Sequence, residues 1–340
     1  MSAVPLAEAP GAAVPFDIIR AAYGELIVTD LDAAARFYVD LLGFIVAART
    51  GDRLYLRGWE ERSHHSLVLR RGPVAVAARV GFRVRSRDDL AALAGELDRR
   101  GLRAQELEGA HLGMGAALRA WDPFGFPLEF FHEMEQVEAQ TQRFDLQRGA
   151  PIVRFDHVNL QTPALEHALA WWRDLGFRCT EYILTDDEER IVFACMARKA
   201  TVHDVALSAG GGPRLHHLGF AVPDPRAVLR VCDQLAGAGY NHRIERGPGR
   251  HGATNAFFLY VRDPDGHRIE LYTGDYYTGD PDLRPRRWSL SDPRCRSFWG
   301  TAAPDSWYRE ASLVTGPDDA PSEVREASVD ELKIRSELMA

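Results

Sequence analysis

Three residues of metal-ligating type, His157, His217 and Glu270, stand on segments that are predicted to be strands in the second half of the 340-residue chain. Glu270 follows the turn signal DPDG (263–266), and strand alternation puts it on the face opposite Ile269. Two imidazoles and one carboxylate on converging strands form a 2-His-1-carboxylate set. Such a set leaves adjacent coordination positions open and is typical of non-haem Fe(II) oxygenases. The spacing therefore predicts a metal site.

The sequence leaves the second imidazole open between two neighbours. Either His216 or His217 has the right residue type, but the register of an internal repeat and the small Gly219 on the same face favour His217. Glu270 alone is weak evidence for a metal site, because Glu129 occupies the corresponding place in the first half of the chain, which lacks these histidines.

The elements that must position these residues come from a chain that repeats itself. The segment YGELIVTDLDAAARFYVDLLGF (23–44) is similar to FDHVNLQTPALEHALAWWRDLGF (155–177), and each pattern predicts a strand, a turn and an amphipathic helix. The segments that begin RVGF (79–102) and HLGF (217–240) also match, and each leads to a D-P-x-G turn and a strand. The sequence therefore predicts an α+β fold of four βαβββ modules, paired into two pseudo-symmetric half-barrel domains with a concave cavity.

The expected division of the chain follows from this repeat. It comprises an N-terminal arm (1–17), a metal-free domain (18–135), a linker (136–151), a catalytic metal-binding domain (152–283) and a C-terminal extension (284–340) whose last residues, 328–340, are predicted to form a short helix. The first domain is expected to be metal-free because Arg79 stands where the second has His217, and a guanidinium does not ligate a cation. Allowing a one-residue gap, Glu25 stands at the place of His157.

Composition narrows the class of protein. The formal net charge of −8 argues against nucleic acid or an anionic membrane as a main partner. No apolar run approaches the length of a membrane span, and the first residues lack the pattern of a signal peptide. The four cysteines have no C-x-x-C spacing, which fits reduced thiols. We therefore expect a cytoplasmic protein that binds neither nucleic acid nor membranes.

Long motifs in the second half resemble those of a known enzyme family. They are RKATVHD (198–204), GPRLHH (212–217), ERGPGRHGATNAFFLY (245–260) and DPDGHRIELYTGDYYTGDPD (263–282). They resemble the type I extradiol ring-cleaving dioxygenases of the vicinal-oxygen-chelate superfamily, most closely the homoprotocatechuate (3,4-dihydroxyphenylacetate) 2,3-dioxygenases. The resemblance implies Fe(II), or Mn(II) in some members, held by His157, His217 and Glu270. It also implies a catechol substrate, cleavage with O2 to a muconic semialdehyde, and a homotetramer.

The resemblance also assigns roles around the metal. His203 matches the acid–base histidine of the family, a task for which imidazole is suited because its pKa lies near the working pH. The other matching positions are Tyr260, which would hydrogen-bond the substrate, His251 near the site entrance, and Asn159, Arg246 and Arg296 in the substrate pocket.

The chain departs from the family at two pocket positions. Cys195 stands where relatives carry a tryptophan, and Cys295 replaces one of two tandem arginines, leaving Arg296. Losing a guanidinium weakens carboxylate recognition, and losing a large aromatic side chain enlarges a pocket. The substrate is therefore expected to carry a larger or less acidic side arm than 3,4-dihydroxyphenylacetate.

Two other functions belong to the same superfamily. A glyoxalase-like, metal-dependent isomerase draws ligands from both halves, so histidines confined to one half count against it. A non-catalytic protein that sequesters a small molecule would hold no stoichiometric iron and would have no need of His203.

Overall fold

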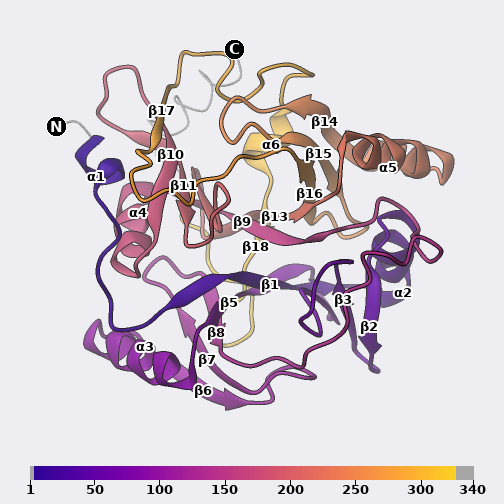
Figure 1. The fold of residues 1–340 in the computed structure, drawn as a ribbon, viewed down its shortest axis with the longest axis horizontal. Helices are drawn as coiled ribbons and strands as arrows, with labels where there is room; N and C mark the ends of the chain where they lie inside the picture. Colours follow the sequence, from indigo (N-terminus) through magenta and orange to yellow (C-terminus); the bar gives the residue numbers. More distant parts are fainter. Residues whose placement is uncertain (1–3, 327–340) are drawn as a thin grey trace.

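The computed structural model describes residues 4–326, and the expected helix at 328–340 lies outside them. The first half of the chain forms an eight-stranded sheet with two helical segments outside it, in the lower part of Figure 1. Its strands are β1 (Ile18–Val28), β2 (Ile45–Arg49), β3 (Arg53–Arg57), β4 (Leu67–Arg71), β5 (Val76–Val84), β6 (Ala104–Glu108), β7 (Ala116–Trp121) and β8 (Pro127–Phe131). The helical segments are α2 (Leu31–Ala35), which continues into η1 (Arg36–Leu41), and α3 (Arg87–Arg99).

The second half repeats this plan and adds the end of the chain to it. Its strands are β9 (Arg154–Thr162), β10 (Arg178–Leu184), β11 (Ile191–Ala197), β12 (Val205–Ala209), β13 (Arg214–Ala221), β14 (Ile244–Arg250), β15 (Phe257–Arg262), β16 (Arg268–Thr273), β17 (Arg286–Ser289) and β18 (Ser312–Leu313). The helices are α4 (Leu165–Asp174), α5 (Pro225–Gly237), the short η2 (Asn241–Arg243) and α6 (Asp305–Arg309), while α1 (Val4–Glu8) precedes the first sheet.

The strand order is the same in the two halves. The first sheet runs β2-β3-β4-β1-β5-β8-β7-β6, and the second runs β10-β11-β12-β9-β13-β16-β15-β14 when read in the same direction. Each half therefore consists of two βαβββ modules whose first strands, β1 with β5 and β9 with β13, pair antiparallel at the centre. This arrangement confirms the predicted α+β fold class of four modules.

Local sequence explains the turn before each functional strand. In the DPDG turn the Asp263 carboxylate accepts hydrogen bonds from the backbone N–H groups of Asp265 and His267, and Gly266 has φ 91°, a conformation that favours glycine. The DPFG turn before β8 is built in the same way around Asp122 and Gly125. These turns fix the register of β16, which carries Glu270, and of β8, which carries Glu129.

The register of the first strands corrects one prediction. Gly219 pairs with His157, and Gly81 pairs with Tyr23, so Tyr23 rather than Glu25 corresponds to His157. The expected gap in the alignment was therefore wrong. The two glycines play the same part in both halves, since each leaves room for the ring opposite it: a Cβ on Gly219 would lie 2.2 Å from the imidazole of His157, and one on Gly81 would lie 1.8 Å from the ring of Tyr23.

The metal-ligand positions of the first half are occupied by groups that satisfy one another. The Tyr23 hydroxyl donates to Glu129, Arg119 donates to the same carboxylate at 2.8 Å, and Arg79 lies 3.7 Å from it. His65, two residues before β4, corresponds to His203, two residues before β12. This half thus keeps the framework of the site but holds an ion-pair network.

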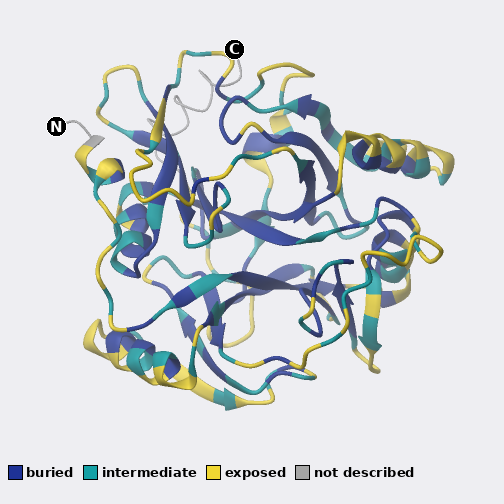
Figure 2. Ribbon diagram, in the orientation of Figure 1, coloured by how far each residue is buried: buried dark blue, intermediate teal, exposed yellow. Residues whose placement is uncertain are grey.

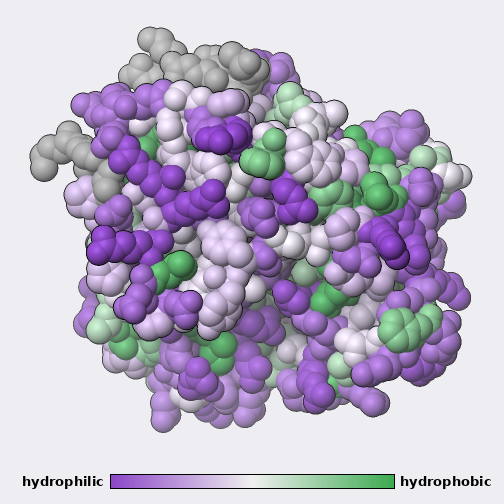
Figure 3. Space-filling model, turned by 45° about the horizontal axis from the view of Figure 1, so that its top comes forward, coloured by the Kyte–Doolittle hydropathy of each residue, from purple (hydrophilic) through white to green (hydrophobic). Residues whose placement is uncertain are grey.

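One hydrophobic core joins the two halves. Phe44 of the first half packs against Phe220 of the second with ring centroids 4.8 Å apart, and Phe82 packs against Trp172 at 5.2 Å. The strands are mostly buried, whereas α3 and α5 expose their outer faces (Figure 2). The face seen in Figure 3 is largely hydrophilic, with its hydrophobic residues in small separate patches. None of the helices in residues 4–326 is long and apolar enough to cross a membrane.

The end of the chain returns to the second sheet. β17 extends the sheet beside β10, β18 pairs with β13, and α6 places Trp307 against His216 with ring centroids 4.4 Å apart. The extension therefore covers the half of the molecule that carries the candidate ligands.

Candidate active site

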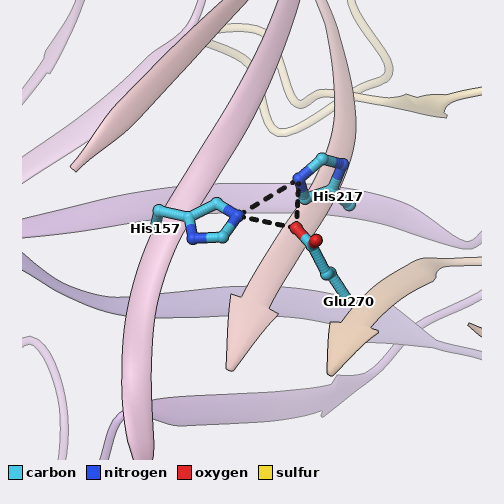
Figure 4. Close-up of side chains that lie close together, drawn as sticks. All are labelled: His157, His217 and Glu270. Carbon is cyan, nitrogen blue, oxygen red and sulfur yellow. Dashed lines mark hydrogen bonds and ion pairs between the residues drawn. The ribbon is translucent and has the colours of Figure 1, made fainter. Parts of the chain in front are cut away.

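The three predicted metal ligands lie together at the centre of the second sheet (Figure 4). His157 is on β9, His217 on β13 and Glu270 on β16, and all three are buried. Glu270 Oε2 lies 2.9 Å from His157 Nε2 and 3.2 Å from His217 Nε2, and the two Nε2 atoms are 3.3 Å apart. Within residues 4–326 this is the only group of three or more such side chains arranged to hold a metal ion.

The neighbour of His157 fixes the tautomer of that imidazole. Asp156 Oδ2 lies 3.0 Å from His157 Nδ1, and Lys199 Nζ lies 2.8 Å from the other oxygen of Asp156. Burial raises the pKa of Asp156, but Lys199 and His157 outweigh it and hold this pKa far below its ordinary value. The ionised carboxylate only accepts hydrogen bonds, so His157 Nδ1 carries a proton and Nε2 faces Glu270.

The neighbour of His217 settles its tautomer as well. His216 Nε2 lies 2.8 Å from the backbone oxygen of Trp307, which only accepts, so this nitrogen donates. Burial keeps the pKa of His216 well below its ordinary value, so this ring is neutral and its Nδ1 is an acceptor. His217 Nδ1, 2.7 Å away, therefore carries a proton and donates to it. Of the two adjacent histidines, His217 joins the cluster and His216 orients it.

The donor set fits a divalent cation. With both Nδ1 atoms protonated, two Nε2 atoms and a carboxylate oxygen converge on one point. Burial lowers the pKa of His157, but the hydrogen bonds to Asp156 and Glu270 outweigh it and raise this pKa to about 9. A metal ion would take the place of a proton on Nε2, because ligating histidines bind in their neutral form.

Removing the carboxylate behind His157 should weaken metal binding. We expect Asp156→Ala to lower the affinity of the metal-free protein for Fe(II) or Co(II) by about 10- to 100-fold, because the imidazole loses the acceptor that orients it. Anaerobic titration with Co(II), followed by its visible absorption, measures this change. Lys199→Met removes the ion pair that keeps Asp156 ionised but leaves the His157 contact, so it should lower the affinity by less than Asp156→Ala does. Equal affinities of Asp156→Ala and the wild type would contradict this assignment.

His203 lies against the candidate ligands. Its ring centroid is 4.0 Å from that of His157, and its Nδ1 has no hydrogen-bond partner among residues 4–326. Burial and the neighbouring His157 hold the pKa of His203 well below its ordinary value, so the ring is neutral and able to accept a proton.

The segment that carries His203 is held by the first half of the chain. Asp204 accepts hydrogen bonds from the backbone N–H groups of Arg198 at 2.7 Å and of Ala21, on β1, at 2.8 Å. The carboxylate next to His203 thus bonds a strand of the other sheet, and the first half contributes to the geometry of the site.

Tyr260 and His251 form a hydrogen-bonded pair on the other side of Glu270. Tyr260, on β15, pairs with Glu270 across the strands. The Tyr260 hydroxyl donates to His251 Nε2 at 2.9 Å, because His251 Nδ1 donates to the backbone oxygen of Arg296 at 2.6 Å. Burial lowers the pKa of His251 to about 3. His251 therefore acts as a neutral acceptor that orients the phenol.

One cavity contains most of the predicted site residues. It is lined by His157, Asn159, His203, His217, Arg246, His251, Tyr260, Glu270, Cys295 and Arg296. Cys195, which was expected to line the substrate pocket, does not. It is fully buried between Glu181 and Ala206 on the neighbouring strands, and Phe193 of the same strand lines the cavity instead.

Other residues of the cavity had not been predicted. They include Ile183, Phe193, Thr254, Asp275 and Trp307. Trp307 comes from the chain extension and carries no local signal, whereas Asp156 and His216 stand directly beside the predicted ligands and adjacency alone would have indicated them.

Comparisons with known proteins agree with this geometry. The model of the Glyoxalase/Bleomycin resistance protein/Dioxygenase superfamily matches residues 20–130 and 154–271. The chain is 32% identical over 298 residues to a manganese-dependent 2,3-dihydroxybiphenyl 1,2-dioxygenase of Geobacillus genomosp. 3, covering 83% of this chain and 94% of that protein.

Solved structures are similar over nearly the whole chain. An extradiol ring-cleaving dioxygenase from B. fuscum superposes with a TM-score of 0.91 at 45% identity, covering 95% of this chain and 91% of the other. Homoprotocatechuate 2,3-dioxygenase from Arthrobacter globiformis gives a TM-score of 0.90 at 47% identity, covering 93% and 98%. The chain therefore belongs to the extradiol ring-cleaving dioxygenases of the Glyoxalase/Bleomycin resistance protein/Dioxygenase superfamily.

Proposed function

We propose that this enzyme cleaves a para-substituted catechol with O2 to a muconic semialdehyde, and that the side arm of its substrate is longer than that of 3,4-dihydroxyphenylacetate and negatively charged. The observation that carries the proposal is one cavity that contains the His157–His217–Glu270 cluster, a neutral histidine and two guanidinium groups. The similarity to enzymes named for 2,3-dihydroxybiphenyl and homoprotocatechuate supports a substituted catechol.

The protein groups divide the work between metal binding and proton transfer. His157, His217 and Glu270 would hold Fe(II) or Mn(II), and the bound metal would bring catecholate and O2 together and let electron density pass between them. His203 is neutral in the metal-free protein and would accept a catechol proton, then return it as the ring opens. Tyr260, whose hydroxyl hydrogen is donated to His251, would accept a hydrogen bond beside the reacting ring.

The charge of the side arm follows from two arginines. Arg246 is 3% exposed and lies over the rings of Phe258 and Trp307; its Nη2 donates to Ser297 Oγ at 2.8 Å, and its Nε has no partner in residues 4–326. Arg296 is half-buried and its Nε is likewise unpartnered there, and neither guanidinium lies within 4.0 Å of a carboxylate of these residues. Buried cations are normally paired, so an anionic group of the substrate beside Arg246 would complete this end of the cavity. This argues against the expectation of a less acidic arm, whereas the expectation of a larger arm depends on the walls of the cavity.

The proposed length of the side arm rests on the size of the lining side chains. Four of them are small, those of Ala206, Ala253, Ala256 and Cys295. They favour an arm longer than a two-carbon acid, although Phe193, on the strand of Cys195, also lines the cavity.

A substrate panel tests the proposal. The protein is loaded anaerobically with Fe(II) and given catechols whose para arms end in a carboxylate or in the matching neutral amide, at several lengths. We expect one O2 consumed per catechol, a yellow product, and the highest kcat/KM with an acid longer than 3,4-dihydroxyphenylacetate. No oxygen uptake from any catechol by the iron-loaded protein would overturn ring cleavage, and a preference for the amides would overturn the charged arm.

Replacing one cavity arginine should remove much of the preference for acids. Arg296→Met is expected to lower kcat/KM for the best acid by about 10- to 100-fold and to leave the matching amide nearly unchanged, because a hydrogen bond to a charged group contributes about 1.5–3 kcal/mol. Arg294→Met is the matched control, since Arg294 is exposed and pairs with Asp292 outside the cavity. A similar loss of kcat/KM for the acid and the amide would show that Arg296 does not bind the charged group.

The family analogy further supports a homotetramer that works in the cytoplasm. Light scattering on the purified protein measures the number of subunits, and a monomer in solution would contradict the tetramer.

A further inference from the structure

A buried carboxylate outside the proposed machinery connects the segments that cover the cavity. Glu181, on β10, is 0% exposed and is not among the cavity-lining residues. Its Oε1 accepts hydrogen bonds from the backbone N–H of Thr254 at 2.9 Å and from the Tyr276 hydroxyl, and its Oε2 accepts one from Trp288 Nε1 at 2.8 Å. The three donors belong to three different segments of the chain.

Each of these segments supplies part of the cavity wall. The loop 251–256 contributes His251, Ala253, Thr254 and Ala256; the segment after β16 contributes Asp275, next to Tyr276; and the segment that begins at β17 leads to Cys295 and Arg296. We call these three segments the cover of the cavity, and Glu181 bonds all of them. The candidate ligands lie instead on β9, β13 and β16.

The loop 251–256 needs such an anchor because of its backbone. Thr254 has φ 69° and Asn255 has φ 59°, both in the left-handed region, which is unfavourable for a β-branched residue such as threonine. The hydrogen bond from Thr254 N–H to Glu181 fixes this turn at its most constrained residue.

The anchored segments also bond each other at functional residues. The N–H of Ala253 donates to the backbone oxygen of Cys295 at 2.8 Å, and His251 Nδ1 donates to that of Arg296 at 2.6 Å. The ring of Trp288 packs with Ala253 and Cys295 in one cluster. A shift of either segment would therefore move His251, its partner Tyr260, and the guanidinium of Arg296 together.

We propose that Glu181 is a positioning residue for ring cleavage, whose carboxylate holds the three covering segments so that His251 and Arg296 stay directed at the substrate. This inference rests on the proposed function, since it assigns the effect to binding of the catechol and its anionic arm. Glu181 itself touches neither the substrate cavity nor the metal ligands.

The test uses an isosteric change and its rescue. In Glu181→Gln one oxygen remains for Thr254 and Tyr276. The new amide NH2 faces the N–H of Trp288, and because both groups are donors, that hydrogen bond is lost. We expect KM for the preferred acidic catechol to rise about tenfold, with kcat within about threefold of the wild type and with the same iron content. Unsubstituted catechol, which has no arm for Arg296 to bind, should show a smaller change in KM.

A second substitution distinguishes a lost hydrogen bond from general damage. Trp288→Phe removes the opposing donor, so the double variant Glu181→Gln/Trp288→Phe should recover most of the KM that Glu181→Gln loses. Trp288→Phe alone loses the hydrogen bond that holds the β17 segment but keeps the other two donors, so its KM should rise by about threefold, to the level of the double variant. A double variant no better than Glu181→Gln alone would overturn the positioning role.

Amide hydrogen exchange gives a readout that does not depend on turnover. In Glu181→Gln, exchange should accelerate in residues 251–256 and 286–297 and stay unchanged in β9 and β13. If the wild type cleaves no catechol, the proposed function fails while this measurement still decides whether Glu181 holds the cover. Unchanged exchange in both segments together with an unchanged KM would refute the proposal.

Discussion

Glu270→Gln is expected to fold like the wild type but to retain no Fe(II) and to cleave no catechol. Glu270 supplies the only negative charge of the three-residue cluster, with its oxygen 2.9 Å and 3.2 Å from the two imidazole nitrogens. An amide oxygen of the same size is neutral and is a poorer ligand for a divalent cation, so the variant keeps the shape of the site and loses most of its affinity. The measurement is iron per chain after anaerobic loading and desalting, followed by oxygen uptake with a catechol.

The matched control is Glu129→Gln, at the equivalent position of the first half. Glu129 accepts hydrogen bonds from Tyr23 and Arg119, so its loss should lower thermal stability, but iron content and ring cleavage should remain. One retained iron per chain in Glu270→Gln would show that the carboxylate is not a ligand. Loss of iron in both variants would point to unfolding and not to ligation.

His203→Ala should hold its metal and lose catalysis. We expect kcat to fall by about 10²- to 10⁴-fold, the usual contribution of a positioned acid–base group, with iron content unchanged because His203 is not in the ligand cluster. The buried, neutral ring of His203 leaves a space that free imidazole fills, so added imidazole should restore part of the rate. Steady-state kinetics with and without imidazole provide the measurement.

His65 offers a matched control for this effect, because it occupies the place of His203 in the first half. His65→Ala creates a similar space in a similar strand arrangement, so it should lower the melting temperature but leave kcat within about threefold. A kcat of His203→Ala equal to that of the wild type would remove His203 from the proton transfers.

The sequence predicted the features that depend on local patterns. The D-P-x-G turns, the L-G-F helix ends and the aromatic pairs repeat at fixed spacing, and these short-range signals are enough to define four modules. The ligand residues could be chosen for the same reason: His157, His217 and Glu270 occupy matching strands of one half, and β-strand alternation gives the side that each faces.

What the sequence did not indicate depends on contacts between distant segments. The place of Trp307 in the cavity results from the return of the extension to β13, which no local periodicity encodes. The position of Cys195 behind the wall depends on its pairing with Glu181 and Ala206. The equivalence of Tyr23 and His157 was missed because the alignment weighed residue type, whereas the register is set by the room beside Gly81 and Gly219.

The late position of the cover in the sequence has a consequence for biosynthesis. When Glu270 has been synthesised, all three candidate ligands and the whole first sheet have been made, but β17, Arg296 and Trp307 have not. The candidate ligands therefore precede, in the order of synthesis, the segments that complete the cavity wall with Cys295, Arg296 and Trp307. The order of the sequence thus allows the ligand cluster to come together before these parts of the wall are made.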